Sequence, residues 1–411
     1  MRPDHRNFYR VTRMAHRNHF QLLFVINFIV TLGFGICDTF FSVYVFELGG
    51  RGALLALPLI SYSVAKAVFS PFMGRCSDTF GPEKIMLVSL TIYLLVSVLF
   101  LVSTNLFILA ISRLLQGVAC AMFRPVIVSL VSESAIKEKR SSIMGTFDIS
   151  FYAALSFGPI VGGYMKDQLG FSAIFSGVTL LCILAILLCT CCVRDSSARV
   201  ATTHSSRNKP SSLIQPIIRS RNLRGLLAFI FGRASCISLT GTFLPIILTE
   251  ELKLTGTQIG IVMASSCLTI TLLLRPMGML ADRVSHAILI ILGGISVSII
   301  YLIIPATLTF TQIIFATTLL GLFSALSQPA CTAMLVEEGT HYGTGNTVGI
   351  FNGAMNLGFI FGPIFGAFIL SGFGIDAVFY SAGVIGASTI LLFALITHPS
   401  LLSPVDSRCK N

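Results

Sequence analysis

The sequence predicts an all-α membrane protein, with twelve transmembrane helices arranged as two pseudo-symmetric six-helix bundles. The first observation is composition: 54% of the 411 residues are hydrophobic and 11% are charged, whereas soluble proteins carry about 25% charged residues. The second is a series of apolar runs of about 20 residues, the length that crosses a bilayer as a helix. These runs are continuous rather than alternating, which favours helices over a β-barrel. The third is an internal repeat.

Each apolar run is one predicted span. In chain order the spans are 20–46, 53–73, 85–103, 106–131, 141–165, 172–193, 223–248, 256–277, 286–306, 310–335, 346–370 and 376–396. The longest connection is rich in Ser, Arg and Thr and is predicted to be a flexible linker. The predicted domains are a basic cytoplasmic tail at 1–19, an N-terminal bundle at 20–193, the cytoplasmic linker at 194–222, a C-terminal bundle at 223–396 and a cytoplasmic tail at 397–411.

The distribution of positive charge orients these spans. Of the 28 Lys and Arg residues, 21 fall on the side that holds both termini and the linker, 3 fall on the opposite side and 4 lie inside spans. Loops rich in Lys and Arg stay in the cytoplasm, so both termini are predicted to be cytoplasmic, and we expect a multi-pass protein of a bacterial inner (cytoplasmic) membrane. The net charge of +11 then reflects topology and contact with lipid headgroups, not a nucleic-acid partner. The 11 cysteines lie mostly singly in apolar runs, so no metal site is predicted.

The internal repeat has a constant offset of 204 residues. The segment 73–78 (MGRCSD) matches 277–282 (MGMLAD), and the segment 158–160 (GPI) matches 362–364 at the same spacing. Gly117 and Pro125 likewise match Gly321 and Pro329. An offset that holds without a gap over about 90 residues indicates two homologous six-span halves joined by the linker.

The motifs within these halves resemble those of the major facilitator superfamily. Gly74-x-x-x-Asp78-x-x-Gly81, followed by Lys84, resembles the motif between its second and third helices, and Arg113-x-x-Gln116-Gly117 resembles a second motif. Gly145, followed by Gly158-Pro159-x-x-Gly162-Gly163, resembles a third, which is typical of proton-coupled antiporters for drugs and other small molecules. Two usual arginines of the first motif are replaced by Thr79 and Pro82, and one usual glycine of the third is Ala154. The resemblance covers about residues 20–396 and implies a substrate site near the midplane, between the halves.

The first motif is predicted to form a latch that holds the halves together at the cytoplasmic face in the outward-facing state. Its glycines allow tight backbone packing, and Asp78 can accept hydrogen bonds from the N-terminus of a neighbouring helix. Glu133 lies at the cytoplasmic end of the fourth span and can join this network. The predicted latch residues of both halves are Gly74, Asp78, Gly81, Lys84, Glu133, Gly278, Asp282 and Arg283.

The glycines and prolines of the fifth and eleventh spans are predicted to allow close helix packing. Small residues let helix backbones approach each other in lipid, and proline frees a carbonyl and permits a bend. We expect these two matched helices to meet helices of the opposite half, either sealing a leak pathway or forming a rocking seam. The residues concerned are Gly145, Gly158, Pro159, Gly162, Gly163, Gly358, Gly362, Pro363 and Gly366.

Charged residues inside spans are candidates for the transport site, since each costs about 2.5–3.5 kcal/mol to insert. Helix geometry places Asp38 about 12 Å and Arg113 about 10 Å below the outer ends of their spans, and the helices that carry them line the central cavity in the superfamily. We therefore predict an Asp38–Arg113 pair, with Asp38 as the titrating proton carrier. Arg124 and Asp148 are predicted to form an inner pair with Lys66 nearby, whereas Arg233 has no obvious acidic partner. The predicted substrate cavity comprises Lys66, Arg124, Asp148, Arg233, Tyr44, Tyr62 and Asn352.

These charges indicate the function. Cations outnumber anions by four to two inside the spans, which predicts a small organic substrate of acidic or amphiphilic character. The leading hypothesis is a monomeric secondary active transporter that exports a drug or small compound in exchange for protons by alternating access, driven by the proton gradient without a cofactor. The alternative is proton-coupled or facilitative uptake of an organic anion. A receptor would need a larger extramembrane domain, and no P-loop, HExxH or supported Ser/His/Asp arrangement indicates an enzyme.

Overall fold

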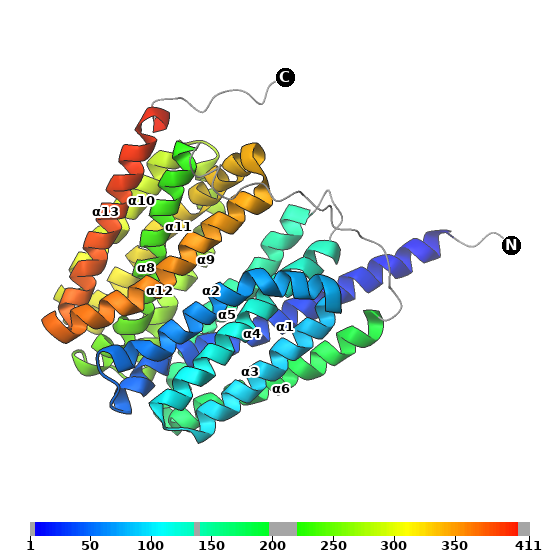
Figure 1. Ribbon diagram of the computed structural model, residues 1–411, viewed down its shortest axis with the longest axis horizontal. Helices are drawn as coiled ribbons and strands as arrows, with labels where there is room; N and C mark the ends of the chain where they lie inside the picture. The colour runs from blue at the N-terminus through cyan, green and yellow to red at the C-terminus, as the bar shows by residue number, and fades with distance from the viewer. Residues whose placement is uncertain (1–4, 135–139, 197–219, 402–411) are drawn as a thin grey trace.

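The computed structural model describes residues 5–134, 140–196 and 220–401, and over these ranges the chain is helical without strands (Figure 1). The first half contains α1 (His5–Glu47), α2 (Ala53–Phe80), α3 (Pro82–Val102), α4 (Leu106–Ser134), α5 (Arg140–Leu169) and α6 (Phe171–Ser196). The second half contains α8 (Arg221–Glu250), α9 (Gly256–Ala281), α10 (His286–Ile303), the short 3-10 helix η2 (Ile304–Ala306), α11 (Phe310–Tyr342), α12 (Thr344–Phe373) and α13 (Ile375–Leu401).

The twelve long helices fall on the twelve predicted spans, with η2 completing the ninth, so the predicted fold class is confirmed. Ten of the helices are long and apolar enough to cross a membrane by themselves. The other two are α2, which contains the shorter apolar stretch Leu54–Ser70, and α5. Both pack against the opposite half, α2 on α12 and α5 on α9, so part of their surface faces protein rather than lipid and can carry polar residues and glycine.

The first helix is longer than its predicted span. The sequence places a tail at 1–19, but α1 already begins at His5. Its first turns contain Arg, Met and Ala, which have high helix propensity, so the helix continues past the end of the apolar run. The protein is a multi-pass integral membrane protein, and many of its large apolar side chains, such as Leu187, Phe315 and Leu391, are exposed on the surface of the bundle.

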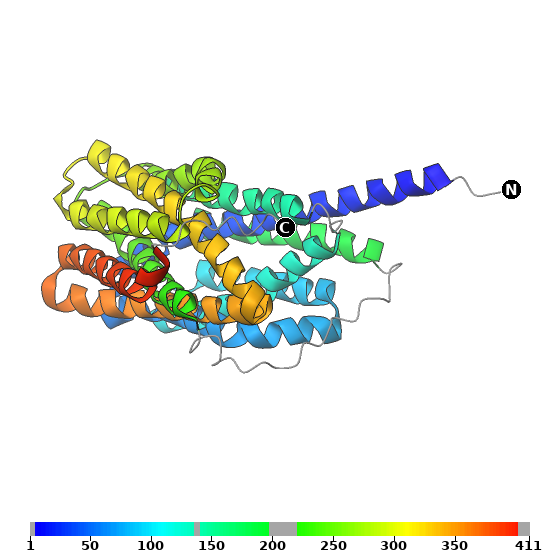
Figure 2. The same cartoon turned by 90° about the horizontal axis from the view of Figure 1, so that it is seen from above.

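The helices of the two halves form two groups that lie side by side (Figures 1 and 2). Within the first group α2 and α3 pack on α4, and α1 packs on α5 and α6; within the second, α8 packs on α12 and α13, and α11 packs on α9 and α10. Contacts between the groups run through α5 on α9, α2 on α12 and α1 on α8. We call the end that holds the α1–α2, α5–α6 and α8–α9 turns the outer end, following the orientation that the charges predict.

The buried apolar core is continuous between the halves only toward the outer end. One cluster joins residues of both halves there, among them Phe40 and Phe41 of α1 and Phe243 of α8. Toward the opposite end the described core splits into two separate clusters, one around Phe147 in the first half and one around Phe393 in the second. The halves are therefore sealed together at the outer end and separately packed at the other end.

The prediction that the glycine-rich faces meet the opposite half is wrong for most of these glycines. A Cβ added at Gly158 or at Gly162 would come within 2.6 Å of the α1 backbone, at Gly35 and Ile36 respectively. Gly358, Gly362 and Gly366 face α8 of their own half in the same way. These glycines fasten α5 to α1 and α12 to α8 within each half, because the spacing of small residues marks a packing face without specifying which helix covers it.

Gly163 is the exception and does face the opposite half. A Cβ at Gly163 would overlap the carbonyl of Gly256 in α9, and a Cβ at Gly260 would overlap the carbonyl of Pro159. Backbone therefore lies against backbone along this α5–α9 contact, which we call the outer seam. The seam can exist only where neither helix carries a side chain.

Candidate functional site

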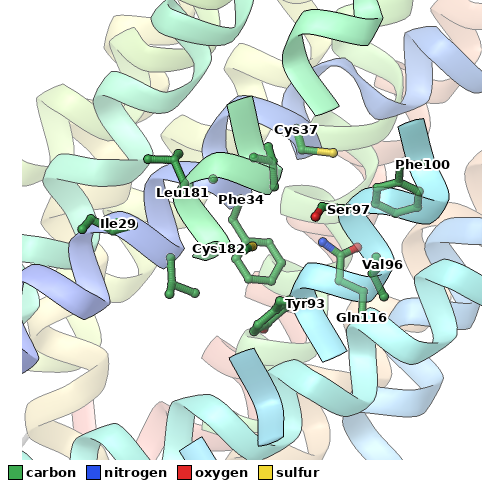
Figure 3. Close-up of a pocket in the computed structure, with 13 residues that line it drawn as sticks. Ile29, Phe34, Cys37, Tyr93, Val96, Ser97, Phe100, Gln116, Leu181 and Cys182 are labelled. Atoms are coloured by element: carbon green, nitrogen blue, oxygen red, sulfur yellow. The ribbon is translucent and has the colours of Figure 1, made fainter. Parts of the chain in front are cut away.

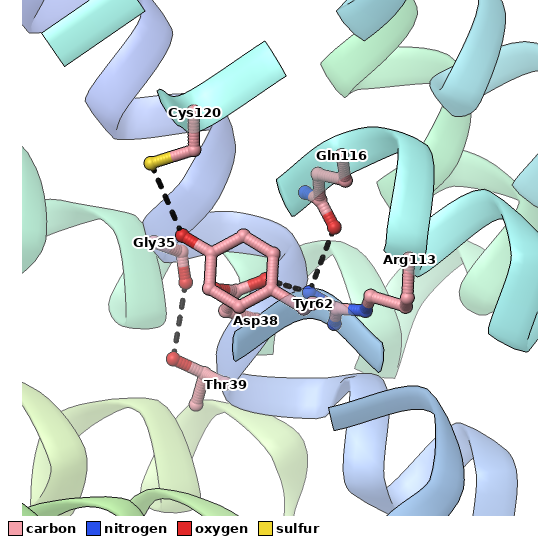
Figure 4. Close-up of polar contacts among 7 residues, drawn as sticks. All are labelled: Gly35, Asp38, Thr39, Tyr62, Arg113, Gln116 and Cys120. Carbon is pink, nitrogen blue, oxygen red and sulfur yellow. Dashed lines mark hydrogen bonds and ion pairs between the residues drawn. The ribbon is translucent and has the colours of Figure 1, made fainter. Parts of the chain in front are cut away.

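The predicted pair of Asp38 and Arg113 is formed in the structure (Figure 4). The Nη1 of Arg113 on α4 donates to Oδ1 of Asp38 on α1 at 2.5 Å and to Oε1 of Gln116 at 2.9 Å. The two partners differ sharply in exposure, since the Arg113 side chain is 1% exposed and the Asp38 side chain 42%. The carboxylate is thus open to water or ligand, while the cation that holds it is enclosed.

Aromatic rings and a small cavity surround the buried guanidinium. Its central carbon lies 3.5 Å from the ring centre of Phe41 and 5.6 Å from that of Phe100, within cation–π distance. The Nε and Nη2 atoms have no hydrogen-bond partner among the described residues. Beside Gln116 lies a cavity of about 20 Å³, lined also by Cys37, Tyr93 and Ser97 (Figure 3). It has room for about one water molecule and none for an organic substrate.

A second charged pair joins α4 to α5. Arg124 Nη2 lies 3.8 Å from Asp148 Oδ1, with side chains 35% and 47% exposed, and the guanidinium lies 3.9 Å above the ring of Phe151. The ammonium of Lys66, which the sequence predicts near this pair, lies 6.0 Å from the ring centre of Tyr62 and 5.8 Å from that of Phe359 on α12. Lys66 therefore belongs to the α2–α12 contact between the halves.

Arg233 has neutral partners. Its Nη1 donates to Ser327 Oγ at 3.2 Å and its Nη2 donates to Gln328 Oε1 at 2.9 Å, and both acceptors belong to α11. The amide nitrogen of Gln328 in turn donates to the hydroxyl of Tyr152 on α5 at 2.7 Å, so this hydrogen bond crosses from one half to the other. Among the described residues Arg233 forms no salt bridge.

The remaining predicted cavity residues are dispersed. Tyr44 packs against Phe171 and Phe175, within the first half and near its outer end, so it lines an aromatic core rather than a substrate cavity. Tyr62 donates to Cys120 Sγ at 3.3 Å and lies beside Asp38 (Figure 4). Asn352 is exposed on α12.

The predicted cytoplasmic latch stays a prediction. The residues whose surroundings are described do not include Gly74, Asp78 and Glu133 of the predicted latch, nor Gly145 of the predicted packing motif. Lys84, Asp282 and Arg283 are exposed. A Cβ at Gly81 or at Gly278 would meet nothing within 4 Å among the described residues, so neither glycine packs against another helix in this structure, whose outer end is closed. Gly81 instead supplies the positive φ of 91° that turns the chain into α3.

A polar contact between the halves that the sequence did not suggest closes the outer seam. Asp167, near the end of α5, accepts hydrogen bonds from the backbone N–H groups of Gly256 and Thr257 at 2.6 and 2.7 Å and from the Thr257 hydroxyl at 2.7 Å. These groups form the first turn of α9, where unpaired N–H groups favour an anion. The corresponding position on α12 at the offset of 204 is Ser371, whose hydroxyl donates to Phe368 of its own helix. We call the contact of Asp167 with the first turn of α9 the clasp. Of the two matched positions, only the one on α5 carries an acidic residue.

The charge of Asp167 is stabilised in the clasp. Partial burial raises its pKa, but the hydrogen bonds from Thr257 and Gly256 and the charge of Lys166 outweigh that effect, and the net pKa lies below the usual value. Because the clasped pKa is lowered, the clasp is stable at and above the usual Asp range near pH 4 and is lost as the outer pH falls through the lowered value. An outer pH between 5 and 7 therefore leaves the clasp closed.

Asp167→Asn is expected to loosen the outer seam. Replacing the carboxylate by a neutral amide removes the negative charge at the first turn of α9 and costs about 1 kcal/mol, a factor of about 5 in the population of the closed outer side. Hydrogen–deuterium exchange of the purified protein in nanodiscs should then show faster exchange in the peptide that contains Gly256 and Thr257. Ser371→Ala is the matched control and should leave exchange unchanged; equal protection in Asp167→Asn and the parent would show that the clasp does not hold the seam.

Sequence reasoning missed Gln328 and Asp167 as site residues. Gln328 could have been found, since it stands at the repeat position of Arg124, just as Asn352 stands at that of Asp148. The charged pair of the first half is thus replaced by neutral amides in the second. No group of His, Cys, Asp and Glu that could hold a metal ion occurs in the described part of the chain.

Comparison with known proteins agrees with the fold of twelve helices in two homologous halves. A family model described as Major Facilitator Superfamily matches residues 23–247 and 226–408. Multidrug resistance protein 2 of Bacillus subtilis is 25% identical over 363 residues, which cover 87% of this chain and 90% of that protein. The multi-drug resistance efflux pump PmrA of Streptococcus pneumoniae is 25% identical over 406 residues, 95% of this chain and 99% of that protein. The crystal structure of the nucleoside transporter NupG has a TM-score of 0.76 at 14% identity and covers 92% of this chain and 99% of that chain, which shows the fold alone.

Proposed function

Because this chain belongs to the Major Facilitator Superfamily and is a transporter of that family, we propose that it exports a small organic compound in exchange for protons. Two relatives along most of its length are named for multidrug resistance or multidrug efflux, and the glycine-proline motif of α5 is the one that the drug antiporters share. These similarities support a drug or other amphiphilic compound as the substrate class. We further propose a monomer in a bacterial inner membrane with both termini in the cytoplasm.

The observation that carries the proposal is the unequal exposure of Asp38 and Arg113. A proton carrier must be reachable by water and must change its interactions when it is protonated. Asp38 is reachable, and protonation removes the negative charge that holds Nη1 of Arg113. Substrate that binds from the cytoplasmic side then competes with the proton for the same region, so one ligand leaves as the other binds.

The packing of the halves supports alternating access. The shared core, the outer seam and the Asp167 clasp close the outer end, whereas the cores at the other end are separate. This arrangement suits a state that receives substrate from the cytoplasm. In the opposite state the seam would open and the predicted latch at Asp78 and Asp282 would close.

The direction of coupling can be measured with purified protein in liposomes. Antiport drives a permanently charged dye into the lumen when the lumen is more acidic than the medium, whatever the orientation of the protein. Proton symport drives the dye inward when the lumen is more alkaline. We expect accumulation only with the acidic lumen, relative to liposomes without protein; accumulation only with the alkaline lumen would replace export by the second candidate.

That second candidate is proton-coupled or facilitative uptake of an organic anion, and one observation favours it. Arg233 lies inside a span with neutral partners, so a positive charge is available to an anionic ligand. Anion recognition and export are compatible, however, since a cation in the cavity selects the substrate and does not set the direction of transport.

A further inference from the structure

We infer that Arg233, Gln328 and Tyr152 form an anion-responsive bridge between the halves, in which the anionic group of a substrate takes the place of the Gln328 amide on Arg233. The inference rests on the proposed function in so far as the bound compound is the transported one. It assigns a ligand class, an organic carboxylate or a similar monovalent anion, to a position that joins α5, α8 and α11.

The positive charge of Arg233 has no anionic partner among the described residues. Arginine stays charged in proteins, and a charge inside the membrane is costly unless it is paired or hydrated. The recorded partners of Arg233 are the hydroxyl of Ser327 and the amide oxygen of Gln328, both neutral. A carboxylate binds a guanidinium about twice as strongly as a neutral acceptor does, so an anionic ligand would displace Gln328.

The space around Arg233 limits the direction from which a ligand can approach. Arg233 borders a cavity of about 30 Å³ whose lining also includes Ser298, Ser324 and Thr389, which has room for about one water molecule but is far smaller than a pocket for an organic compound. An organic anion therefore cannot approach from within the second half. It must come from the side of Gln328 and Tyr152, which are both partly exposed at the contact between the halves.

Binding of a ligand to Arg233 would weaken the bridge between the halves. Gln328 uses its oxygen for Arg233 and its nitrogen for the Tyr152 hydroxyl, at 2.9 and 2.7 Å. A ligand that takes Arg233 removes the bond that orients the amide and thereby weakens the link between α11 and α5. Tyr152 lies at mid-depth on the same helix that forms the outer seam, so binding at this position acts on the contact that must open during transport.

The test uses two probes that differ in charge, 4-butylbenzoate and 4-butylbenzamide, and measures their affinities for the purified full chain at one pH without a gradient. The chain contains no tryptophan, so a tryptophan introduced as Phe359→Trp at the α2–α12 contact reports binding without background from other tryptophans. In this background we expect benzoate to bind on the order of tenfold more tightly than benzamide. Equal affinities would overturn the inference.

Three variants identify the residue responsible. Arg233→Gln should abolish the preference for benzoate. Gln328→Glu should also abolish it, because the new carboxylate pairs with Arg233 permanently. Lys253→Asn is the control: Lys253 is 74% exposed in the outer loop at a positive φ that asparagine tolerates, and its loss should leave the preference intact. A preference that survives in both Arg233→Gln and Gln328→Glu would contradict the inference.

These measurements are independent of proton exchange. If the preference disappears in Arg233→Gln but the parent shows no pH-driven flux, the anion site stands and the antiport proposal fails. If flux is driven by an acidic lumen but the preference is unaffected by both variants, the antiport proposal stands and the anion site fails.

Discussion

Asp38→Asn is expected to reduce pH-gradient-driven transport to the level of liposomes without protein while leaving the protein folded. Asparagine keeps the shape of the side chain and can still accept from Nη1 of Arg113, but it cannot take up and release a proton. The exchange of labelled for unlabelled substrate across the membrane needs no net proton movement and should continue in the variant. This difference between driven flux and exchange separates a lost proton carrier from a lost binding site.

A control for this prediction lies on the same helix. Glu47 at the outer end of α1 lies 3.5 Å from Lys166, in a pair that the proposed mechanism does not use. Glu47→Gln should retain driven flux, because the carboxylate of Glu47 is half exposed and contributes little through a single pair. Driven flux in Asp38→Asn with an unchanged dependence on pH would assign the proton to another group and remove Asp38 from the mechanism.

Gly163→Val is expected to lower transport by at least about tenfold without preventing folding. The first added carbon overlaps the carbonyl of Gly256, which is backbone and cannot rotate away, so α5 and α9 must separate. Overpacking costs about 1–3 kcal/mol, and here that cost falls on the outer-closed state in particular, because Gly163 faces the opposite half. Faster hydrogen exchange at the start of α9 should accompany the loss of transport.

Two further glycines serve as controls for that result. A Cβ at Gly241 on α8 would meet nothing within 4 Å, so Gly241→Ala should keep transport and gain helix propensity. Gly158 packs on α1 of its own half, so Gly158→Ala should lower the Tm without favouring either state. If Gly163→Val transports normally, the outer seam does not need its close backbone contact, and the role assigned to that contact is wrong.

The pair of Asp38 and Arg113 shows what sequence can predict about the site. Opposite charges at similar depth on two helices are costly alone and are stabilised together. Their contact can therefore be predicted from the signs of the two charges and their depths in the spans. The protonation role of Asp38 does not follow from the contact and remains a proposal. The same reasoning brought Arg124 near Asp148, whereas it did not predict that Lys66 lies beside the rings of Tyr62 and Phe359.

The contact of Arg233 shows where such reasoning ends. Its partners carry no charge, and serine and glutamine leave no signal in hydropathy or charge that would connect α8 to α11. Tyr152 is one aromatic residue among many, and only the packing of α5 against the second half brings it to Gln328. The repeat gives a partial indication, since Gln328 replaces the arginine of the first half.

The sequence by itself determined the membrane class, the twelve spans and the two homologous halves, because hydropathy, charge and repeat spacing are properties read along the chain. It also determined which faces carry small residues. Only the tertiary structure decided which helix covers each face: α1 and α8 cover most of the glycines of the two packing motifs, whereas Gly163 alone among the described glycines of these motifs meets the other half. The physical reason is that a face of small residues allows close approach by any neighbouring helix. Which helix becomes the neighbour depends on how all the helices pack together.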